Sequence, residues 1–393
     1  MKFDYHIPTK VLFGAGKLNQ LKKEVLPGKK ALVVISGGTS MKKNGYLDRV
    51  VGLLEENGVD SIVFDKILPN PIRKHVMEGA ALAKSESCDF VLGLGGGSSI
   101  DSAKSIAVMA KNPGDYWDYI FGGSGKGQPV TNGVLPIVAI TTTAGTGTEA
   151  DPWTVISHEE RNEKIGYGLI PETFPVLSIV DPELMLSVPK ELTAFQGFDA
   201  FFHAAEGYIA DIATPVSDSY ALKSIELLAK NLPTAVSDGS NLEARSNVAL
   251  ANTLSGFVES TSTCISEHSL EHALSAFYPE LPHGAGLIIL SKAYFSFFAD
   301  VVPERYKEMA RVMGKKVEGV SDQDSAMLFI EALGELQDAC GVGNLKMSDY
   351  GISEADIPKF TDNAFDTMGA LFNRDPKKLS KEDVINIYRD AYK

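Results

Sequence analysis

The chain has 393 residues, 44% of them hydrophobic, which is enough to bury a core in each of two domains and excludes a disordered or fibrous protein. Its 37 Lys and Arg residues face 51 Asp and Glu residues, and a net charge of −14 without a basic block excludes nucleic acid as an expected partner. The most apolar long window, residues 284–302, contains Lys292 and Asp300, and the N-terminus lacks a signal-peptide core, so we expect a cytoplasmic protein outside the membrane.

The first half of the chain alternates short apolar runs with amphipathic stretches, which is the pattern of a parallel sheet covered by helices. The predicted strands, each expected to be buried on both faces, are residues 31–35, 61–64, 90–94, 134–141 and 176–180. The predicted helices are residues 47–56, 72–84 and 99–110. We therefore predict an α/β domain with a parallel sheet over residues 1–185.

The second half of the chain has almost no strand-like runs. Long amphipathic patterns follow one another instead, at residues 220–231, 242–261, 302–313 and 324–340. The domain boundary is placed near residue 186, because Pro189 there is typical of the first turn of a helix. Residues 186–393 are thus predicted to form an all-helical domain.

A run of three glycines, residues 95–97, follows a predicted strand and leads into a predicted helix. Glycines let the backbone approach a large anion, and the helix N-terminus favours negative charge, so Gly96, Gly97 and Ser98 are candidates to bind a pyrophosphate. The alternative is a tight turn with a structural role only. The run is a near miss to the dinucleotide fingerprint, and no acid follows it on a second strand, so standard Rossmann geometry is disfavoured.

A second glycine-rich loop, residues 141–149, also follows a predicted strand. Open α/β sheets bind ligands at the carboxyl ends of their strands. Two such loops at one edge of a sheet suit a long cofactor.

Four of the seven histidines lie between residues 203 and 283, which favours a metal site in the second half. Asp199 and His203 are four residues apart in a helical pattern, and His268 and His272 repeat this spacing before His283. A carboxylate with several imidazoles suits a divalent first-row ion. The spacing does not say which four residues bind, and His272 is either a fifth ligand or a proton carrier.

Two other interpretations compete with this metal site. A lone helical histidine is usually a core or surface residue, so the metal site depends on the five residues occurring together. The segment from His268 through Glu271 to His272 also matches the H-x-x-E-H motif of zinc peptidases. A zinc hydrolase, however, leaves the α/β half unexplained and gives Asp199 and His203 no role.

The ordered set of motifs resembles the iron-containing (group III) alcohol dehydrogenases over nearly the whole chain. The motifs are residues 7–16, 95–104, 142–149, 197–206, His268 and 282–284. The resemblance implies a nucleotide-binding domain of the dehydroquinate-synthase-like type, a helical metal-binding domain, and a cleft between them for metal and nicotinamide. It also implies a homodimer.

By this resemblance the metal ligands are Asp199, His203, His268 and His283, and His272 is a histidine that helps to move a proton. The resemblance implies Fe²⁺ as the bound metal, and the same set of ligands also accepts Zn²⁺, Ni²⁺ or Mn²⁺. The chain departs from the family at two places. Between His272 and His283 it has one residue more than many members, and the sequence of residues 266–272 is unusual for the family.

The resemblance also assigns the cofactor residues. Gly96, Gly97 and Ser98 would hold the pyrophosphate. The residues along the ribose and nicotinamide path would be Asp101, Thr141, Thr142 and Lys164. NAD-preferring members tend to carry an acid where this chain has Gly38, and the segment continues with Thr39, Ser40 and two lysines. NADP(H) is therefore favoured over NAD(H).

The predicted function is a metal-dependent, NAD(P)-linked alcohol dehydrogenase or aldehyde reductase for a small alcohol or aldehyde, with the substrate oxygen on the metal during hydride transfer. The alternative on the same fold is a polyol or polyol-phosphate dehydrogenase, or a synthase. A phosphorylated substrate would need a site rich in Lys and Arg, and few such residues lie between 199 and 283.

Overall fold

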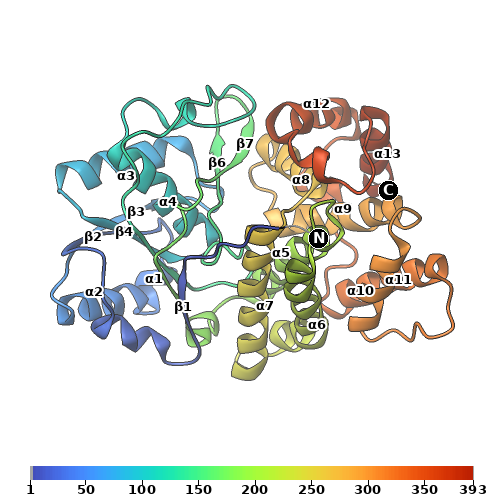
Figure 1. The fold of residues 1–393 in the computed structure, drawn as a ribbon, viewed down its shortest axis with the longest axis horizontal. Coiled ribbons are helices and arrows are strands. Elements are labelled where there is room, and N and C mark those ends of the chain that lie inside the picture. The colour runs from blue at the N-terminus through green and yellow to red at the C-terminus, as the bar shows by residue number, and fades with distance from the viewer. Residues whose placement is uncertain (1–2, 393) are drawn as a thin grey trace. The chain divides into compact units, whose positions relative to one another are not determined.

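The computed structural model describes residues 3–392, which form two compact units (Figure 1). One unit is Ile7–Ser187, and the other begins at Val188 and includes the N-terminal segment up to His6.

The first unit contains a six-stranded sheet in the order β1-β8-β5-β4-β2-β3. All five strand pairings are parallel, so the carboxyl ends of the strands share one edge. In that order the strands are Lys10–Phe13, Leu177–Val180, Ile137–Thr141, Phe90–Gly95, Lys30–Ser36 and Asp60–Ile67. The parallel sheet predicted for this half is confirmed.

Helices cover both faces of this sheet (Figure 1). The helices are α1 Ser40–Lys43, α2 Tyr46–Glu56, α3 Arg73–Ser85 and α4 Gly97–Lys111, with short 3₁₀ segments at Lys17–Lys23, Tyr116–Asp118 and Pro182–Met185. Leu18 and Val50 belong to the core on one face, where the first 3₁₀ segment and α2 meet the sheet. On the other face α4 packs directly against Gly93, where a Cβ would come within 2.8 Å of Ile100 Cα.

The prediction that each strand is buried on both faces is wrong for residues 61–64, and the predicted strands 134–141 and 176–180 begin too early, because residues 134–136 are only partly buried and Val176 is exposed. β3 is an edge strand, because it pairs only with β2 in the sheet order, and Ser61, Ile62 and Val63 stay partly exposed. Three strands were not predicted: β1, and β6 Thr154–His158 with β7 Glu163–Tyr167, which form a separate antiparallel pair. These strands are four or five residues long, and the last two contain polar residues that hide the apolar pattern.

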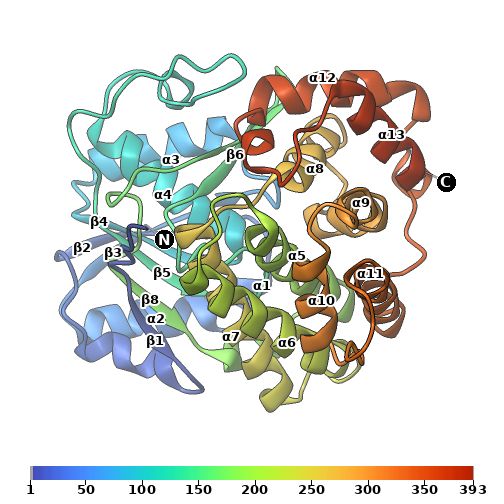
Figure 2. The ribbon, with the colours of Figure 1, turned by 45° about the vertical axis from the view of Figure 1, so that its right-hand side comes forward.

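The second unit is helical throughout its described elements, as predicted (Figure 2). Its helices are α5 Lys190–Ile209, α6 Pro215–Ser237, α7 Leu242–Thr261, α8 Ser266–Phe277, α9 His283–Phe298, α10 Pro303–Val312, α11 Asp322–Ala339, α12 Ile357–Met368 and α13 Lys381–Tyr392; the 3₁₀ segments are Met347–Tyr350, Glu354–Asp356 and Leu371–Arg374. α5 is buried around nearly its whole circumference and contacts α6, α7 and α9. It is therefore the central helix of this unit.

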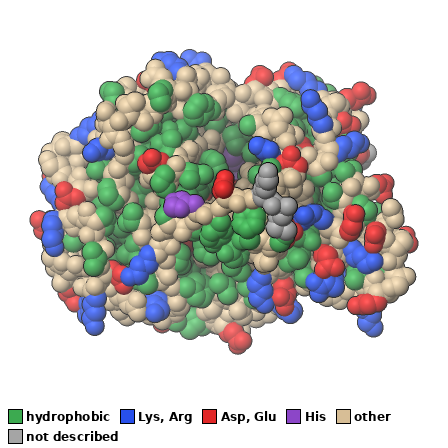
Figure 3. All heavy atoms as spheres, viewed as in Figure 1, with side chains coloured by type: hydrophobic (Ala, Val, Ile, Leu, Met, Phe, Trp, Pro, Cys, Tyr) green, Lys and Arg blue, Asp and Glu red, His purple; other side chains and the backbone are tan. Residues whose placement is uncertain are grey.

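The surface agrees with the composition. On the face drawn in Figure 3, Lys and Arg side chains are interspersed with Asp and Glu side chains rather than gathered into one basic area. Among residues 3–392, no helix has the length and apolarity needed to cross a membrane.

Candidate active site

The centre of the candidate metal site is the carboxylate of Asp199 on α5. One helical turn later, His203 places its Nδ1 atom 3.6 Å from Asp199 Oδ1. Both residues are buried, because α5 is the central helix, and their spacing of four puts them on one face. The predicted pairing of these two residues is therefore present in the fold.

The other two predicted ligands come from α8 and α9. His268 Nε2 lies 3.6 Å from Asp199 Oδ1, and His283 Nε2 lies 3.5 Å from the same oxygen. The rings of His203 and His268 stack with their centroids 4.3 Å apart. The structure thus brings all four side chains together from three helices.

This arrangement fits a divalent metal ion. Four ligand atoms at about 2.1 Å from a tetrahedral ion lie about 3.4 Å from one another, close to the separations seen around Asp199 Oδ1. Ligand atoms of Asp199, His268 and His283 all lie within 4.8 Å of one another; His203 is not in this group, and its Nδ1 lies 3.6 Å from Asp199 Oδ1. Asp199 Oδ1 and His268 Nε2 are also buried without a hydrogen-bond partner among the described residues, and a bound ion would satisfy both atoms.

The electrostatics of the cluster favour a positive charge. Burial by itself would raise the pKa of Asp199, but His203, His283 and His268 lower it to about 2. Burial would lower the pKa of His268, but Glu206 and Asp199 raise it well above its usual value. Both shifts have the carboxylates of Asp199 and Glu206 and the imidazoles as their source, so the cluster is a negative environment that also favours a bound cation.

Two buried glutamates contact the far nitrogens of the imidazoles; Glu206 had no predicted role, and Glu271 entered only through the zinc-peptidase motif. Glu206 binds His268 Nδ1, and Glu271 binds His283 Nδ1. Such carboxylates fix the orientation of metal-binding histidines and increase their basicity. Helical spacing could have identified Glu206. It follows Asp199 by seven residues and His203 by three, so all three residues lie on one face of α5.

His272 lies beside the four predicted ligands. Its ring centroid is 5.4 Å from that of His283 and 6.4 Å from that of His268. It also forms a second group of potential ligands with Glu271 and His283. The side chain is buried at the cluster, so both alternatives of the sequence analysis, a fifth ligand and a proton carrier, are geometrically open.

The candidate cofactor residues of the first unit gather at the carboxyl edge of its sheet. Gly96 and Gly97 follow β4, and Thr141 and Thr142 lie at the end of the neighbouring strand β5, where Thr142 N–H donates to the Gly95 carbonyl at 2.9 Å. The two glycine-rich loops touch, since a Cβ on Gly97 would come within 2.4 Å of Thr146 Cγ2. This shared edge is where a parallel sheet binds a long ligand.

Two side chains at this edge form hydrogen bonds with backbone carbonyls of the protein itself. The Ser98 hydroxyl donates to the Pro69 carbonyl, and the Thr141 hydroxyl donates to the Thr143 carbonyl at 2.9 Å. Ser98 therefore offers a ligand its backbone N–H group, which belongs to the first turn of α4.

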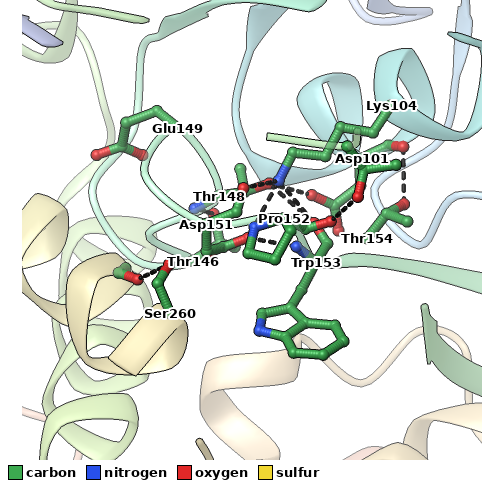
Figure 4. A network of polar contacts seen from close by, with 12 residues as sticks. Asp101, Lys104, Thr146, Thr148, Glu149, Asp151, Pro152, Trp153, Thr154 and Ser260 are labelled. Carbon is green, nitrogen blue, oxygen red and sulfur yellow. Dashed lines mark hydrogen bonds and ion pairs between the residues drawn. The ribbon is translucent and has the colours of Figure 1, made fainter. Parts of the chain in front are cut away.

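Asp101 belongs to a buried network that holds the second loop (Figure 4). Its carboxylate accepts hydrogen bonds from the Thr148 hydroxyl at 2.7 Å and from Val155 N–H at 2.9 Å. One turn later, the fully buried Lys104 ammonium donates to Thr148, to Asp151 and to the Trp153 carbonyl at 2.7 to 3.1 Å. Asp101 was predicted to lie on the cofactor path, and no role was predicted for Lys104.

The segment predicted to select the cofactor follows β2 at the same edge. Gly38 precedes Thr39, which occupies the N-cap position of the short helix α1 without a side-chain hydrogen bond, and Ser40 begins that helix. Space at Gly38 is open, because the atom nearest to an added Cβ is Ser36 Oγ at 3.7 Å. Lys42 forms an exposed ion pair with Asp65 of β3.

Lys164 comes from another element. It lies on β7, opposite Ser157 of β6, and is buried.

Comparison with known proteins agrees with the fold. Residues 8–182 match the family model "Iron-containing alcohol dehydrogenase", and residues 193–392 match the C-terminal model of the Fe-containing alcohol dehydrogenase family. A 1,3-propanediol dehydrogenase of Citrobacter freundii is 35% identical over 393 residues, with 99% of both chains covered. An NAD-dependent methanol dehydrogenase of Bacillus methanolicus is 33% identical over 392 residues, with the same coverage.

Solved structures give the same result. An archaeal halo-thermophilic alcohol dehydrogenase from a Red Sea brine pool superimposes with a TM-score of 0.95 at 33% identity, covering 100% of this chain and 99% of that one. A 1,3-propanediol oxidoreductase has a TM-score of 0.92 at 33% identity and full coverage of both chains.

The family models and the relatives place this α/β unit and helical unit in the class of metal-dependent, NAD(P)-linked oxidoreductases. The chain belongs to the iron-containing alcohol dehydrogenase family, which confirms the resemblance stated from its motifs. It is accordingly an alcohol dehydrogenase.

Proposed function

We propose that this enzyme interconverts a small alcohol and its aldehyde, with Asp199, His203, His268 and His283 holding the metal and with NADP(H) favoured over NAD(H). The observation that carries the proposal is the position of Asp199 Oδ1, which lies 3.5 to 3.6 Å from a nitrogen of each of the three histidines. Curated relatives named for 1,3-propanediol and methanol support a short alcohol as substrate.

When bound, a divalent ion supplies Lewis acidity that lowers the pKa of an alcohol hydroxyl, and the nicotinamide accepts the hydride. The chain's own residues prepare this chemistry. Asp199 contributes negative charge among the imidazoles, and Glu206 orients His268. We assign His272 the transfer of the hydroxyl proton away from the site, because imidazole titrates near neutral pH.

The cofactor assignment rests on the carboxyl edge of the first unit. There the N-terminal turn of α4, with Gly96, Gly97 and Ser98, would receive the pyrophosphate. Asp101, Thr141, Thr142 and Lys164 stay proposals for the ribose and nicotinamide path, with Asp101 acting through the loop that it holds. Residues 1–185 would thus be the cofactor domain, and residues 186–393 the metal domain.

The preference for NADP(H) rests on the segment after β2. Gly38 presents no carboxylate to repel a 2′-phosphate, and Thr39 and Ser40 add hydroxyls. Relatives named as NAD- or NADH-dependent make NAD(H) the competing choice. Initial rates with NADPH and NADH over a panel of short aldehydes and ketones decide between the two.

Metal analysis combined with two variants tests the site. We expect His268→Ala to lose both metal and activity, because it removes a ligand, whereas His272→Ala keeps its metal and turns over more slowly. Equal loss of metal from both variants would make His272 a ligand instead. Light scattering of the purified enzyme tests the homodimer that the family resemblance implies.

A further inference from the structure

Glu271 is a buried carboxylate whose position is tied to one predicted metal ligand. It lies on α8, three residues after His268, and its side chain is fully buried. Its Oε2 atom binds Nδ1 of His283, the first residue of α9. Nδ1 and Nε2 are the two nitrogens of the same ring, so a carboxylate on Nδ1 leaves Nε2 directed at Asp199, 3.5 Å away.

Gly286 leaves space for the Glu271 side chain. A Cβ added to Gly286, in the first turn of α9, would come within 2.8 Å of Glu271 Cγ and 3.0 Å of Glu271 Oε1. Any other residue at position 286 would therefore push against the glutamate side chain, and also against Leu281, whose Cδ2 would lie 3.1 Å from the added Cβ. The first turn of a helix also favours a nearby carboxylate, because the helix dipole is positive there.

His283 is the ligand that most needs such support. Its side chain is 23% exposed, against 10% for His203 and 3% for His268. Packing restrains an exposed ring less than a buried one, so a hydrogen bond has to fix the orientation of this ligand.

We propose that Glu271 is a positioning residue for the metal, that it holds and polarises His283, and that Gly286 is required because it leaves space for the Glu271 carboxylate. This inference rests on the metal site of the proposed function. Glu271 then acts on His283 as Glu206 acts on His268, so two of the three imidazole ligands carry a buried carboxylate partner.

Metal affinity is the readout, measured by titrating chelator-stripped enzyme with Zn²⁺ in competition with a chromophoric chelator. We expect Glu271→Gln, which keeps the shape but removes the charge, to weaken Zn²⁺ binding by about 10–100-fold. Gly286→Ala is expected to weaken binding similarly, because the added methyl group displaces Glu271. Gly334→Ala on α11 is the matched control, since its Cβ makes only ordinary contacts, with Lys292 at 3.4 Å, and it should bind Zn²⁺ like the wild type.

The double variant Glu271→Ala, Gly286→Ala separates positioning from packing. It removes the clash and fills part of the space, so its melting temperature should exceed that of Gly286→Ala while its Zn²⁺ affinity stays low. Recovery of wild-type affinity in the double variant would show that Glu271 only fills space, and would overturn the inference.

Three further outcomes overturn the inference in distinguishable ways. Unchanged affinity in Glu271→Gln, with one ion bound by the wild type, rejects the role of Glu271 and leaves the proposed function intact. Two ions in the wild type and one in Glu271→Ala would make Glu271 a ligand of a second ion with His272 and His283. A wild type that binds no ion rejects the proposed metal site and the inference together.

Discussion

Asp101 lies in the motif that resembles a cofactor-binding run, yet both of its carboxylate oxygens are engaged inside the first unit. Burial raises the pKa of this carboxyl to about 6, although Lys104 and the hydrogen bonds from Thr148 and Val155 oppose the rise. At neutral pH Asp101 is therefore ionised although it is buried, and this burial lowers the stability of the folded protein. Its hydrogen bonds link α4 to β6 and to the loop before β6.

This shift predicts how stability depends on pH. An unfolded Asp has a pKa of about 3.9, so between about pH 4 and 6 the folded protein binds the extra proton, and stability falls as the pH rises. Relative to Asp101→Asn, the wild type should lose up to about 3 kcal/mol of unfolding free energy across this range. Urea unfolding of both proteins at several pH values measures the difference, and parallel curves would contradict the assignment.

Lys104 gives a second prediction at this scale. Replacing it with Met leaves Asp151, Thr148 and the Trp153 carbonyl without their buried donor, so we expect a loss of about 3–5 kcal/mol in unfolding free energy. The exposed Lys111→Met on the same helix serves as the control and should change stability little. Urea unfolding measures the stability, and fluorescence titration with NADPH tests whether the loosened loop also weakens cofactor binding.

At the scale of elements, α4 and the loop after β5 are fitted to each other at Gly97. An added Cβ would lie 2.4 Å from Thr146 Cγ2, so Gly97→Ala must separate the helix N-terminus from this loop. We expect overpacking to cost about 1–3 kcal/mol and NADPH affinity to fall, because both loops line the same edge. Thermal unfolding and NADPH titration measure the two effects.

Gly52 in α2 is the matched control for this substitution, because nothing lies within 4 Å of its added Cβ. Gly52→Ala should stabilise the protein by about 0.5–1 kcal/mol, since alanine loses less backbone entropy in a helix. NADPH affinity should be unchanged. If both variants weakened NADPH binding equally, the close fit at Gly97 would not be the cause.

At the scale of the whole molecule, the metal cluster joins three helices that are separate along the chain. Asp199 and His203 come from α5, His268 comes from α8 and His283 begins α9. A ligand that binds only the folded state stabilises it by about 4 kcal/mol at a thousand times its dissociation constant. Stripping the metal with a chelator should therefore lower the melting temperature, and adding the ion back should restore it.

Calorimetry with and without chelator checks this prediction. His268→Ala is the control, because a protein without a metal site should melt at the same temperature under both conditions. A wild type whose melting temperature ignores the chelator would mean that the ion contributes nothing to the stability of the fold.

Much of the architecture was predictable from the sequence by itself because periodicity and helix spacing are local properties. Residues 242–261 were predicted as a helix with the bounds that α7 has, and the spacing of four between Asp199 and His203 placed both on one face of α5. The order of the motifs along the chain also predicted the protein family. The exposure of β3 was not predictable, because its place at the sheet edge depends on strand order.

The tertiary structure decided which side chains serve the predicted ligands. Glu271 meets His283 only because α8 and α9 pack together, and Gly286 leaves space for it only in that packing. Asp101 is directed into the protein because α4 lies against β6. Contacts between residues distant in sequence depend on how whole elements pack, and no local pattern encodes that packing.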